Sequence, residues 1–255
     1  MRITLLQTAP EWGDPVRSRE DARRMLMGTS RSELIVLPEM FSTGFVTAPE
    51  GIAESEEGET LKWMKELAAT KGSAVAGSVP VWTGDSYRNR LYFVWPDGNV
   101  RYYDKHHLFT HAGEHLQYTP GEERVIVEHA GFRILLQVCY DLRFPVFSRN
   151  RVVDGQPLYD LAVYVASWPQ QRMDAWDALL KARAIENVCF VAGVNRVGKD
   201  PGNLYSGHTS LYGPRGELLS TCKEGRIDII EYEIKKPVLD QFRNTFPALD
   251  DADPQ

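Results

Sequence analysis

Cysteine is scarce in this 255-residue chain, and the few cysteines are not spaced as a metal site or a disulfide framework requires. Cys139, Cys189 and Cys222 are odd in number and lie far apart, which is not the pattern of a disulfide-stapled protein. No Cys-x-x-Cys pair occurs, so a structural zinc knuckle is excluded. These absences predict a reducing compartment, the cytoplasm.

Long apolar runs and a strong charge of one sign are absent too. The longest apolar stretches, 161–166 and 188–194, are too short to cross a bilayer. The net charge is −6, from 29 basic and 35 acidic residues, which gives no electrostatic reason to expect a nucleic-acid or membrane partner. Residues 1–10 lack the apolar region of a signal peptide, so export is not expected.

Apolar patterning predicts strands and helices that alternate along much of the chain. Strands are expected over 3–7, 34–37, 74–79, 91–95, 100–103, 125–127, 132–138, 161–166, 188–194, 209–212, 217–220 and 227–234. Helices are expected over 15–27, 58–71 and 173–187. Tight turns join several strand pairs, so an α/β fold with mixed sheets is favoured over a purely parallel one. We expect one domain over 1–255, with a frayed acidic tail over 249–255.

Cys139 stands where the apolar run 134–138 ends and a turn begins. This is the local arrangement of a nucleophile elbow, in which a strand-to-helix turn lifts the side chain out of the sheet. Backbone N–H groups after such a turn can activate a thiol and hold an oxyanion. The alternative is a buried cysteine at a strand end, an interpretation that also suits Cys189 and Cys222.

Two charged residues also follow predicted strands. Glu39 follows the run 34–38, at the carboxyl edge of the predicted sheet, where α/β enzymes place their catalytic and binding residues. Its apolar neighbours suit a general base. Lys105 follows the strand over 100–103 and lies among aromatic residues. Beside a desolvated glutamate, this lysine would stay charged and stabilise negative charge. A solvated loop glutamate and a surface lysine are the alternatives.

The order and spacing of these three residues resemble the Glu-Lys-Cys triad of the nitrilase superfamily of carbon–nitrogen hydrolases. The matching motifs are Leu-Pro-Glu-Met-Phe at 37–41, Tyr-Asp-Lys-His-His-Leu at 103–108 and Cys-Tyr-Asp-Leu-Arg-Phe-Pro at 139–145. The segments 183–187 and 194–198 match as well, so the resemblance covers nearly the whole chain. It implies a four-layer α-β-β-α sandwich, commonly assembled as a homodimer through the helix after the nucleophile.

Within the superfamily, the sequence is most similar to the bacterial ω-amidases, which hydrolyse 2-oxoglutaramate and related monoamides. The segments 112–115 and 166–169, together with Cys139-Tyr140, carry this similarity. The resemblance implies that Cys139 attacks the amide, Glu39 transfers protons, and Lys105 with the Tyr140 backbone N–H holds the oxyanion. It places the family's second active-site glutamate at Glu114. It also implies that the enzyme needs no metal or organic cofactor and that its partner is a small-molecule amide substrate.

Residues that bind the substrate are less clearly marked. Arg172, just past the turn at 168–169, could grip the free carboxylate of a monoamide, or be a solvated loop residue. Phe41 and Trp168 could line the pocket or belong to the core. Arg143 is expected to be structural, pairing with a carboxylate near the elbow.

Other functions are compatible with parts of the sequence. His106, His107, His111 and His115 include two His-x3-His spacings, which would suit a metallohydrolase, although Thr110 and Gly113 weaken a helix there. Histidines in an active-site loop are the alternative interpretation. A non-catalytic binding protein, an N-carbamoyl amidohydrolase and an amidase for deaminated glutathione are further alternatives.

Overall fold

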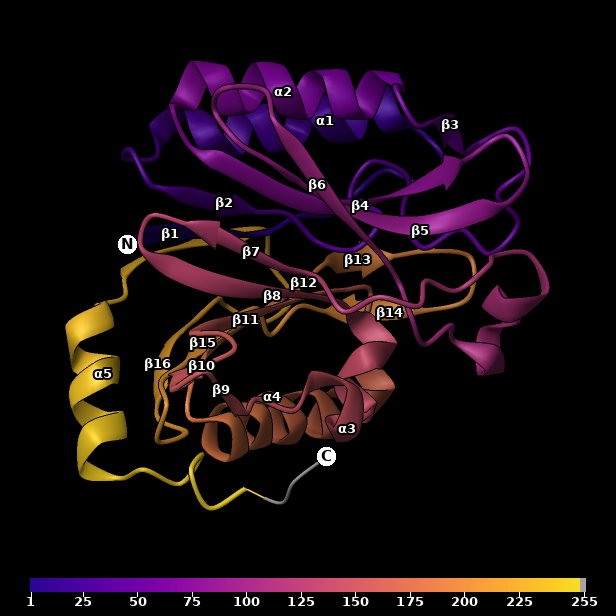
Figure 1. The fold of residues 1–255 in the computed structure, drawn as a ribbon. Helices are drawn as coiled ribbons and strands as arrows, with labels where there is room; N and C mark the ends of the chain where they lie inside the picture. The colour runs from indigo at the N-terminus through magenta and orange to yellow at the C-terminus, as the bar shows by residue number, and fades with distance from the viewer. Residues whose placement is uncertain (253–255) are drawn as a thin grey trace.

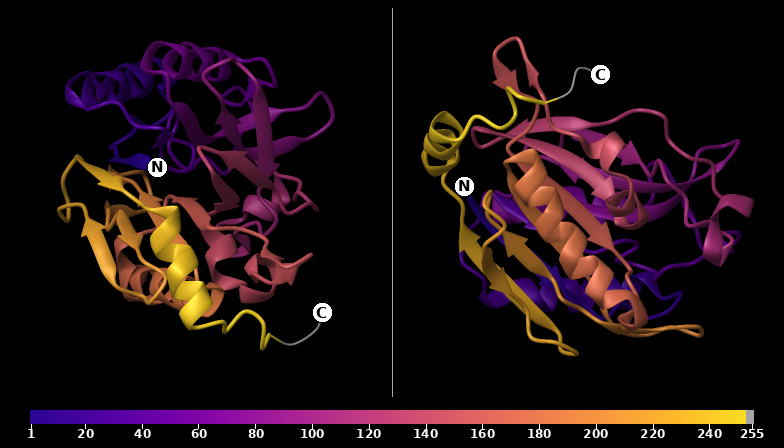
Figure 2. Two further views of the ribbon diagram at one scale, coloured as in Figure 1. Left: turned by 60° about the vertical axis from the view of Figure 1, so that its left-hand side comes forward. Right: turned by 90° about the horizontal axis from the view of Figure 1, so that it is seen from below.

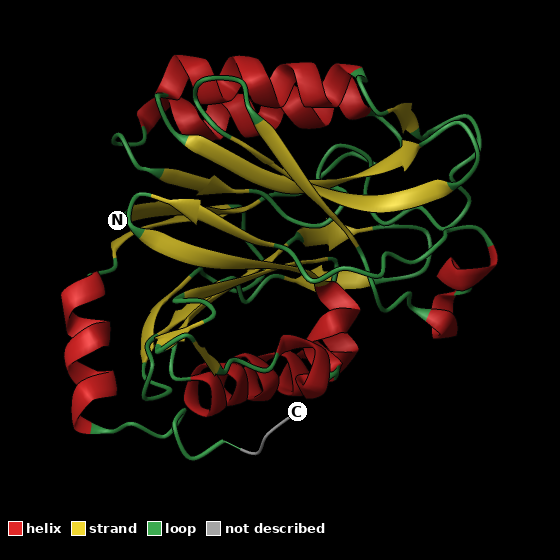
Figure 3. Cartoon of the chain, in the orientation of Figure 1, coloured by secondary structure: helices red, strands yellow, loops and turns green. Residues whose placement is uncertain are grey.

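A computed structural model describes residues 1–252 and arranges them in four layers, with two β-sheets packed face to face between layers of helix (Figure 1). Figure 3 shows the helices outermost on either side of the strands. The mixed-sheet α/β sandwich expected from the sequence is therefore confirmed. The chain completes most of the first sheet before entering the second, and it returns to the first sheet with its last strand.

The first sheet has the order β17-β1-β2-β4-β5-β6, with the short strand β3 paired to β4. Strands β1, β2 and β4 run parallel, whereas β17, β5 and β6 pair with antiparallel neighbours. The strands are β1 (Arg2–Gln7), β2 (Leu34–Val36), β3 (Glu54–Ser55), β4 (Ala74–Trp82), β5 (Tyr87–Val94), β6 (Val100–Asp104) and β17 (Asp228–Glu233).

The second sheet has the order β16-β15-β12-β11-β8-β7, in which β8, β11 and β12 are parallel. Two small hairpins, β9–β10 and β13–β14, lie outside the large sheets. The strands are β7 (Ile126–His129), β8 (Phe132–Val138), β9 (Val152–Val153), β10 (Gln156–Pro157), β11 (Leu161–Ala166), β12 (Phe190–Asn195), β13 (Val197–Lys199), β14 (Leu204–Ser206), β15 (Ser210–Tyr212) and β16 (Leu218–Thr221).

Helices cover the outer face of each sheet. α1 (Pro15–Met25) and α2 (Glu59–Lys71) lie on the first sheet, and α3 (Pro145–Ser148) and α4 (Met173–Asn187) lie on the second (Figure 1). α2 ends at Gly72 in the left-handed conformation, as expected from the sequence. α5 (Lys236–Thr245) stands at the edge of the second sheet rather than in a helix layer (Figure 2).

The strand β2 shows why a continuous apolar run forms here. Leu34 and Val36 face the core between the two sheets, whereas Ile35 and Leu37 face the core beneath α1 and α2. Successive side chains of a strand point to opposite faces, so a strand buried on both sides must be apolar throughout. All four side chains are at most 2% exposed.

The contact between α4 and the second sheet depends on a glycine. A side chain at Gly193 on β12 would come within 2.3 Å of Leu180 and 2.8 Å of Trp176. Because glycine has no Cβ atom, the helix can approach the strand closely at this point. This close packing positions the start of α4, and with it the loop that precedes the helix, against the carboxyl ends of β11 and β12.

The structure contains elements that were not predicted: α5, the short strand β3, and the β9–β10 and β13–β14 hairpins. Leu249, the first residue of the tail expected to fray, is 6% exposed, and residues 253–255 lie outside the described residues. The helix expected over 15–27 ends at Met25 and continues as a 3₁₀ turn, Leu26–Gly28.

Candidate active site

Three of the predicted catalytic residues meet at the carboxyl ends of strands from both sheets. Glu39 lies in the loop after β2, Lys105 directly follows β6, and Cys139 directly follows β8. The Lys105 ammonium donates to Glu39 Oε1 at 2.9 Å. Neither the Lys105 nor the Glu39 side chain is exposed to solvent. The two strand ends therefore bring together residues that are 66 positions apart in the sequence.

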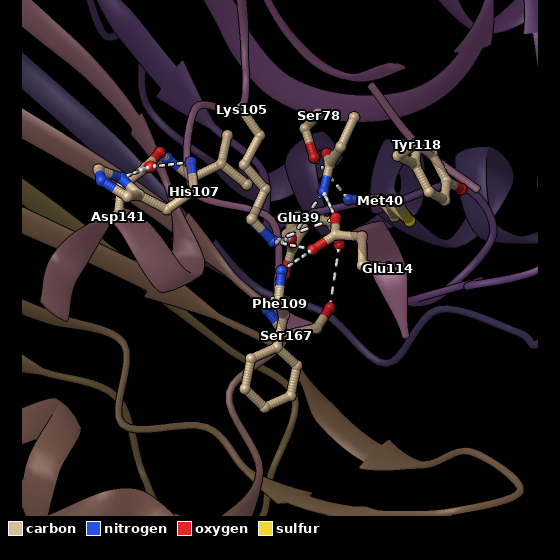
Figure 4. A network of polar contacts seen from close by, with 12 residues as sticks. Glu39, Met40, Ser78, Lys105, His107, Phe109, Glu114, Tyr118, Asp141 and Ser167 are labelled. Carbon is tan, nitrogen blue, oxygen red and sulfur yellow. Dashed lines mark hydrogen bonds and ion pairs between the residues drawn. The ribbon is translucent and has the colours of Figure 1, made fainter. Parts of the chain in front are cut away.

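Glu114 completes this cluster of charges. The Lys105 ammonium also donates to Glu114 Oε2 at 2.9 Å and to Oε1 at 3.2 Å, and the Phe109 backbone N–H donates to the same carboxylate. Figure 4 shows Glu39, Lys105 and Glu114 pointing toward one another. The position assigned to Glu114 by resemblance thus lies within the cluster, and one lysine bridges two buried carboxylates.

Asn89 on β5 is a member of this cluster that the sequence analysis missed. Its side-chain nitrogen donates to Glu39 Oε1 at 2.8 Å and to Glu114 Oε1 at 3.0 Å. Asn89 is 1% exposed. Its signal in the sequence is a polar residue two positions before the apolar run over 91–95, and the predicted strand did not include it.

Cys139 adopts a strained backbone conformation. Its φ is +48°, in the left-handed region that non-glycine residues rarely occupy. Such strain persists only where the surrounding structure fixes it. The residue begins a 3₁₀ turn, Cys139–Arg143, so the side chain leaves the sheet at the turn as the elbow interpretation expected.

Asp141 fixes this turn. Its carboxylate accepts hydrogen bonds from the Val138 backbone N–H at 2.9 Å, the Tyr103 hydroxyl at 2.7 Å and the His107 backbone N–H at 2.9 Å. Burial, and then the Asp141 charge, raise the pKa of the Tyr103 hydroxyl well above its ordinary value, so that group stays protonated and donates. From the other side, Arg183 on α4 donates to the Leu142 carbonyl at 2.6 Å.

The charges of the cluster act on the thiol in opposite directions. Burial raises the pKa of Cys139 well above its ordinary value, and Glu39 raises it further, whereas Lys105 lowers it. Burial also lowers the pKa of the Lys105 ammonium, but Glu114 and Glu39 outweigh this and raise it well above its ordinary value. At neutral pH the resting site therefore holds a neutral thiol beside a charged lysine.

A cavity of about 400 Å³ opens above Cys139. Cys139 and Ser167 line it, whereas Glu39, Lys105 and Glu114 are at most 1% exposed and are not among its lining residues. The Ser167 backbone N–H donates to Glu39 Oε2 at 2.8 Å, so the Glu39 carboxylate contacts a residue of the cavity lining directly. Aromatic side chains form much of the lining: Trp12, Phe45, Phe109, Tyr140, Trp168 and Tyr205.

Of the residues predicted to bind the substrate, two line the cavity and one does not. Trp168 and Arg172 line the cavity. Phe41 does not: it is 1% exposed and packs in the core beneath α2, with its ring centroid 5.7 Å from that of Trp63. Arg143 was expected to pair with a carboxylate, but it lines the cavity and lies against the Trp168 ring, 5.0 Å from the centroid. Phe41 thus belongs to the core, the second of the two alternatives for it, and the carboxylate pairing expected for Arg143 is wrong.

The four histidines do not gather as a ligand set. His106 Nδ1 lies 2.6 Å from the Gly121 carbonyl, and His107 Nδ1 lies 2.8 Å from Asp141. His111 lines the cavity, whereas His115 is exposed. Within residues 1–252, no group of three or more His, Cys, Asp or Glu side chains is placed to hold a metal ion. The rings of His106 and His107 stack instead on Phe147 and Phe144.

The comparison with known families agrees with this geometry. The family model of the carbon–nitrogen hydrolases matches residues 2–244. This chain belongs to the carbon–nitrogen hydrolase family. The enzyme class expected from the triad is therefore confirmed, and the chain hydrolyses carbon–nitrogen bonds.

Similar proteins include an enzyme named omega-amidase YafV from Escherichia coli strain K12, which is 46% identical over 99% of this hydrolase and 97% of its own length. A 2-oxoglutaramate amidase from Bacillus subtilis is 34% identical over 98% of this chain and 96% of its own. Among solved structures, XC1258 from Xanthomonas campestris, a CN-hydrolase superfamily protein with an arsenic adduct in the active site, has a TM-score of 0.97. It is 42% identical and covers 100% of this chain and 98% of its own.

Within residues 1–252, no helix combines the length and the apolar character needed to cross a membrane.

Proposed function

We propose that this hydrolase is an ω-amidase, which converts 2-oxoglutaramate or 2-oxosuccinamate and water to the dicarboxylic oxo acid and ammonia. The observation that carries the proposal is that Cys139 lines a cavity and that the buried, ion-paired Glu39 and Lys105 lie near enough to act on its thiol, Glu39 raising its pKa and Lys105 lowering it. The similarity to an omega-amidase and to a 2-oxoglutaramate amidase over nearly the full chain supports this choice of substrate.

The first half of the reaction forms a thioester. Glu39 takes the Cys139 proton as sulfur attacks the amide carbon, because the thiol is neutral at rest and needs a base. Lys105 and the Tyr140 backbone N–H stabilise the negative charge that develops on the carbonyl oxygen. The carbon–nitrogen bond then breaks, and Glu39 returns the proton to the leaving nitrogen, which departs as ammonia.

The second half regenerates the enzyme. Glu39 takes a proton from water, the resulting hydroxide attacks the thioester carbon, and the carbon–sulfur bond breaks. The proton returns to the Cys139 sulfur. Glu114 and Asn89 hold Lys105 and Glu39 in place throughout. Loss of an oxyanion donor costs about 10²–10³ in kcat in other enzymes, so Lys105→Ala should lower kcat by at least about 100-fold.

The far end of the substrate carries a carboxylate, for which Arg172 is the proposed ligand. Arg172 lines the cavity together with Cys139, so an extended monoamide could reach both. An arginine matches a carboxylate with two parallel hydrogen bonds. Kinetics of Arg172→Ala test this: KM should rise for the monoamide, and an unchanged KM would reject the role.

The proposal also covers the domain organisation, the oligomeric state and the cellular location of the enzyme. We propose that the chain forms one domain over 1–255, which the face-to-face packing of the two sheets in residues 1–252 supports. A homodimer is proposed because Val146 on α3, the helix after the nucleophile, is 74% exposed; light scattering after size exclusion measures it. A cytoplasmic location is proposed because Cys139, Cys189 and Cys222 are all free thiols, which is typical of a reducing compartment.

The deciding experiment measures ammonia release from 2-oxoglutaramate and 2-oxosuccinamate by the wild type and by Cys139→Ala. Release that is lost in the variant is expected. No release by the wild type would reject this substrate class, and carbamoyl and glutathione-derived amides would be tested next. Release that survives in the variant would reject the thiol mechanism. Inactivation by a thiol alkylator but not by a chelator would separate this enzyme from a metallohydrolase.

A further inference from the structure

Two arginine side chains, those of Arg143 and Arg172, line the same cavity. Arg143 comes from the turn after Cys139, and Arg172 comes from the turn Gln170–Arg172 before α4. Within residues 1–252, neither guanidinium takes part in an ion pair. Both are partly buried, and a guanidinium removed from water needs an acceptor for its N–H groups.

Aromatic rings hold both guanidinium groups in place. The Arg143 Cζ atom lies 5.0 Å from the centroid of the Trp168 ring, and the Arg172 Cζ atom lies 5.2 Å from that of Phe109. A cation over an aromatic face is attracted by the ring quadrupole. This contact orients a guanidinium without using its N–H groups, which stay free for a ligand.

Trp168 connects the two arginines. Its ring supports Arg143, and its indole N–H donates to the Arg172 carbonyl at 2.8 Å. Asn195 in turn holds the Trp168 backbone, accepting from its N–H at 2.8 Å and donating to its carbonyl at 3.0 Å. One side chain, 3% exposed, therefore contacts the Arg143 guanidinium and anchors the backbone of Arg172.

The acidic residue in the cavity lining does not serve as their counter-ion. Asp200 Oδ1 accepts the backbone N–H groups of Gly202 and Asn203 at 2.8 and 2.7 Å. Its Oδ2 accepts the Tyr205 hydroxyl at 2.5 Å. Both oxygens thus serve to hold the β13–β14 turn, which leaves Arg143 and Arg172 as the charged groups available to a ligand in the cavity.

We propose that Arg143 is a second carboxylate-binding residue, and that Arg143 and Arg172 together determine specificity for amides whose far end is anionic. The inference rests on the proposed function, because it names the part of the same cavity that recognises the substrate. A 2-oxo acid offers three acceptor oxygens, two on the carboxylate and one on the adjacent carbonyl. Two guanidinium groups can engage all three, whereas a neutral amide with an alkyl chain has no acceptor at its far end.

The test compares an anionic amide, 2-oxoglutaramate, with a neutral one, butyramide. Arg143→Met keeps much of the side-chain length and removes the charge, and Arg151→Met, at an exposed position outside the cavity lining, is the matched control. Hydrogen bonds to charged groups contribute about 1.5–3 kcal/mol. The ratio of kcat/KM for 2-oxoglutaramate to that for butyramide should therefore fall roughly 10- to 100-fold in Arg143→Met, mainly through KM, but not in the control.

Calorimetric binding of 2-oxoglutaramate to Cys139→Ala and to Cys139→Ala/Arg143→Met gives a readout without turnover, and weaker binding by the double variant is expected. Equal affinities, or an unchanged ratio of kcat/KM, would reject the role of Arg143. A wild type that releases no ammonia from 2-oxoglutaramate would instead reject the proposed function. A fall in activity toward both amides alike, with a lowered melting temperature, would mean that Arg143 is structural and would also overturn the inference.

Discussion

The side-chain nitrogen of Asn89 lies 2.8 Å from the Glu39 carboxylate and donates a hydrogen bond to it. The same nitrogen donates to Glu114 at 3.0 Å, and the Lys105 ammonium donates to both carboxylates as well. Two carboxylates that share a buried site repel each other. They are held together here by one charged donor and one neutral donor, so Asn89 is a positioning residue for Glu39 and Lys105.

Asn89→Leu should therefore lower activity without removing any charge. Leucine has a similar volume but no donor, and hydrogen bonds to charged groups contribute about 1.5–3 kcal/mol. We expect kcat/KM for 2-oxoglutaramate to fall roughly 10- to 100-fold. The kcat/KM of Asn89→Asp should fall further, because aspartate adds a third carboxylate to the buried site. Asn244→Leu, at an exposed position on α5, is the control, and an Asn89→Leu enzyme with wild-type kinetics would contradict the role.

Asn89 also shows which parts of the site the sequence could predict. Glu39 and Cys139 were found because an apolar run marks where a buried strand ends, and parallel strands present their carboxyl ends at one edge. Asn89 lies within a strand, and its burial makes sense only beside a carboxylate 50 positions away. Contacts over such distances are not contained in local patterning.

α5 was missed for a different reason. Its apolar residues Val238, Leu239 and Phe242 recur at helical spacing, so the pattern was present in the sequence and was overlooked. What the sequence does not contain is its docking, in which Arg243 bonds to Asp160 at 2.6 Å. The sequence left Phe41 open between the core and the cavity, and gave Arg143 the wrong partner, for a related reason: adjacent residues can face a core or a cavity, and only the packing of other elements decides between them. Phe45, four residues later, lines the cavity instead of Phe41.

The ionisation of Cys139 should respond in opposite directions to its two charged neighbours. Glu39 raises the pKa of the thiol and Lys105 lowers it. Glu39→Gln should therefore lower the pKa of Cys139, so that the thiolate appears at lower pH than in the wild type. Lys105→Met should raise that pKa and delay ionisation. Both variants should nevertheless lose most hydrolysis, because the base or the oxyanion charge is gone.

Ultraviolet titration of the thiolate measures these shifts. The background carries Cys189→Ala and Cys222→Ala so that Cys139 is the only thiol observed; burial raises the pKa of Cys222 to about 12. Shifts of the same sign in both variants would show that charge does not govern the thiol. Iodoacetamide labelling against pH provides an independent check, since only the thiolate reacts.

Asp141 should matter for stability as well as for activity. Its buried carboxylate accepts from the Val138 backbone N–H, the Tyr103 hydroxyl and the His107 backbone N–H. Asp141→Ala leaves these donors unsatisfied, and each such loss costs about 1–3 kcal/mol. We expect the free energy of unfolding to fall by about 3 kcal/mol or more, and kcat to fall because the Cys139 turn loses its anchor.

Denaturant unfolding measures this loss. Glu128→Ala, which removes an exposed carboxylate from β7, should leave the unfolding midpoint within experimental error of the wild type. If Asp141→Ala unfolds at the same denaturant concentration as this control, the strained conformation of Cys139 must be held by other contacts.

Trp168 offers a way to separate its two contacts. Trp168→Phe keeps a ring for Arg143 to lie against but loses the indole N–H that donates to the Arg172 carbonyl. Trp168→Leu loses both contacts. Since a neutral hydrogen bond contributes about 1 kcal/mol, KM for 2-oxoglutaramate should rise roughly fivefold in the first variant and more in the second. Trp82→Phe, on β4 and outside the cavity lining, is the control. Equal KM values for Trp168→Phe and the wild type would mean that the indole N–H does not position Arg172. Trp168 would then support only Arg143, through its ring.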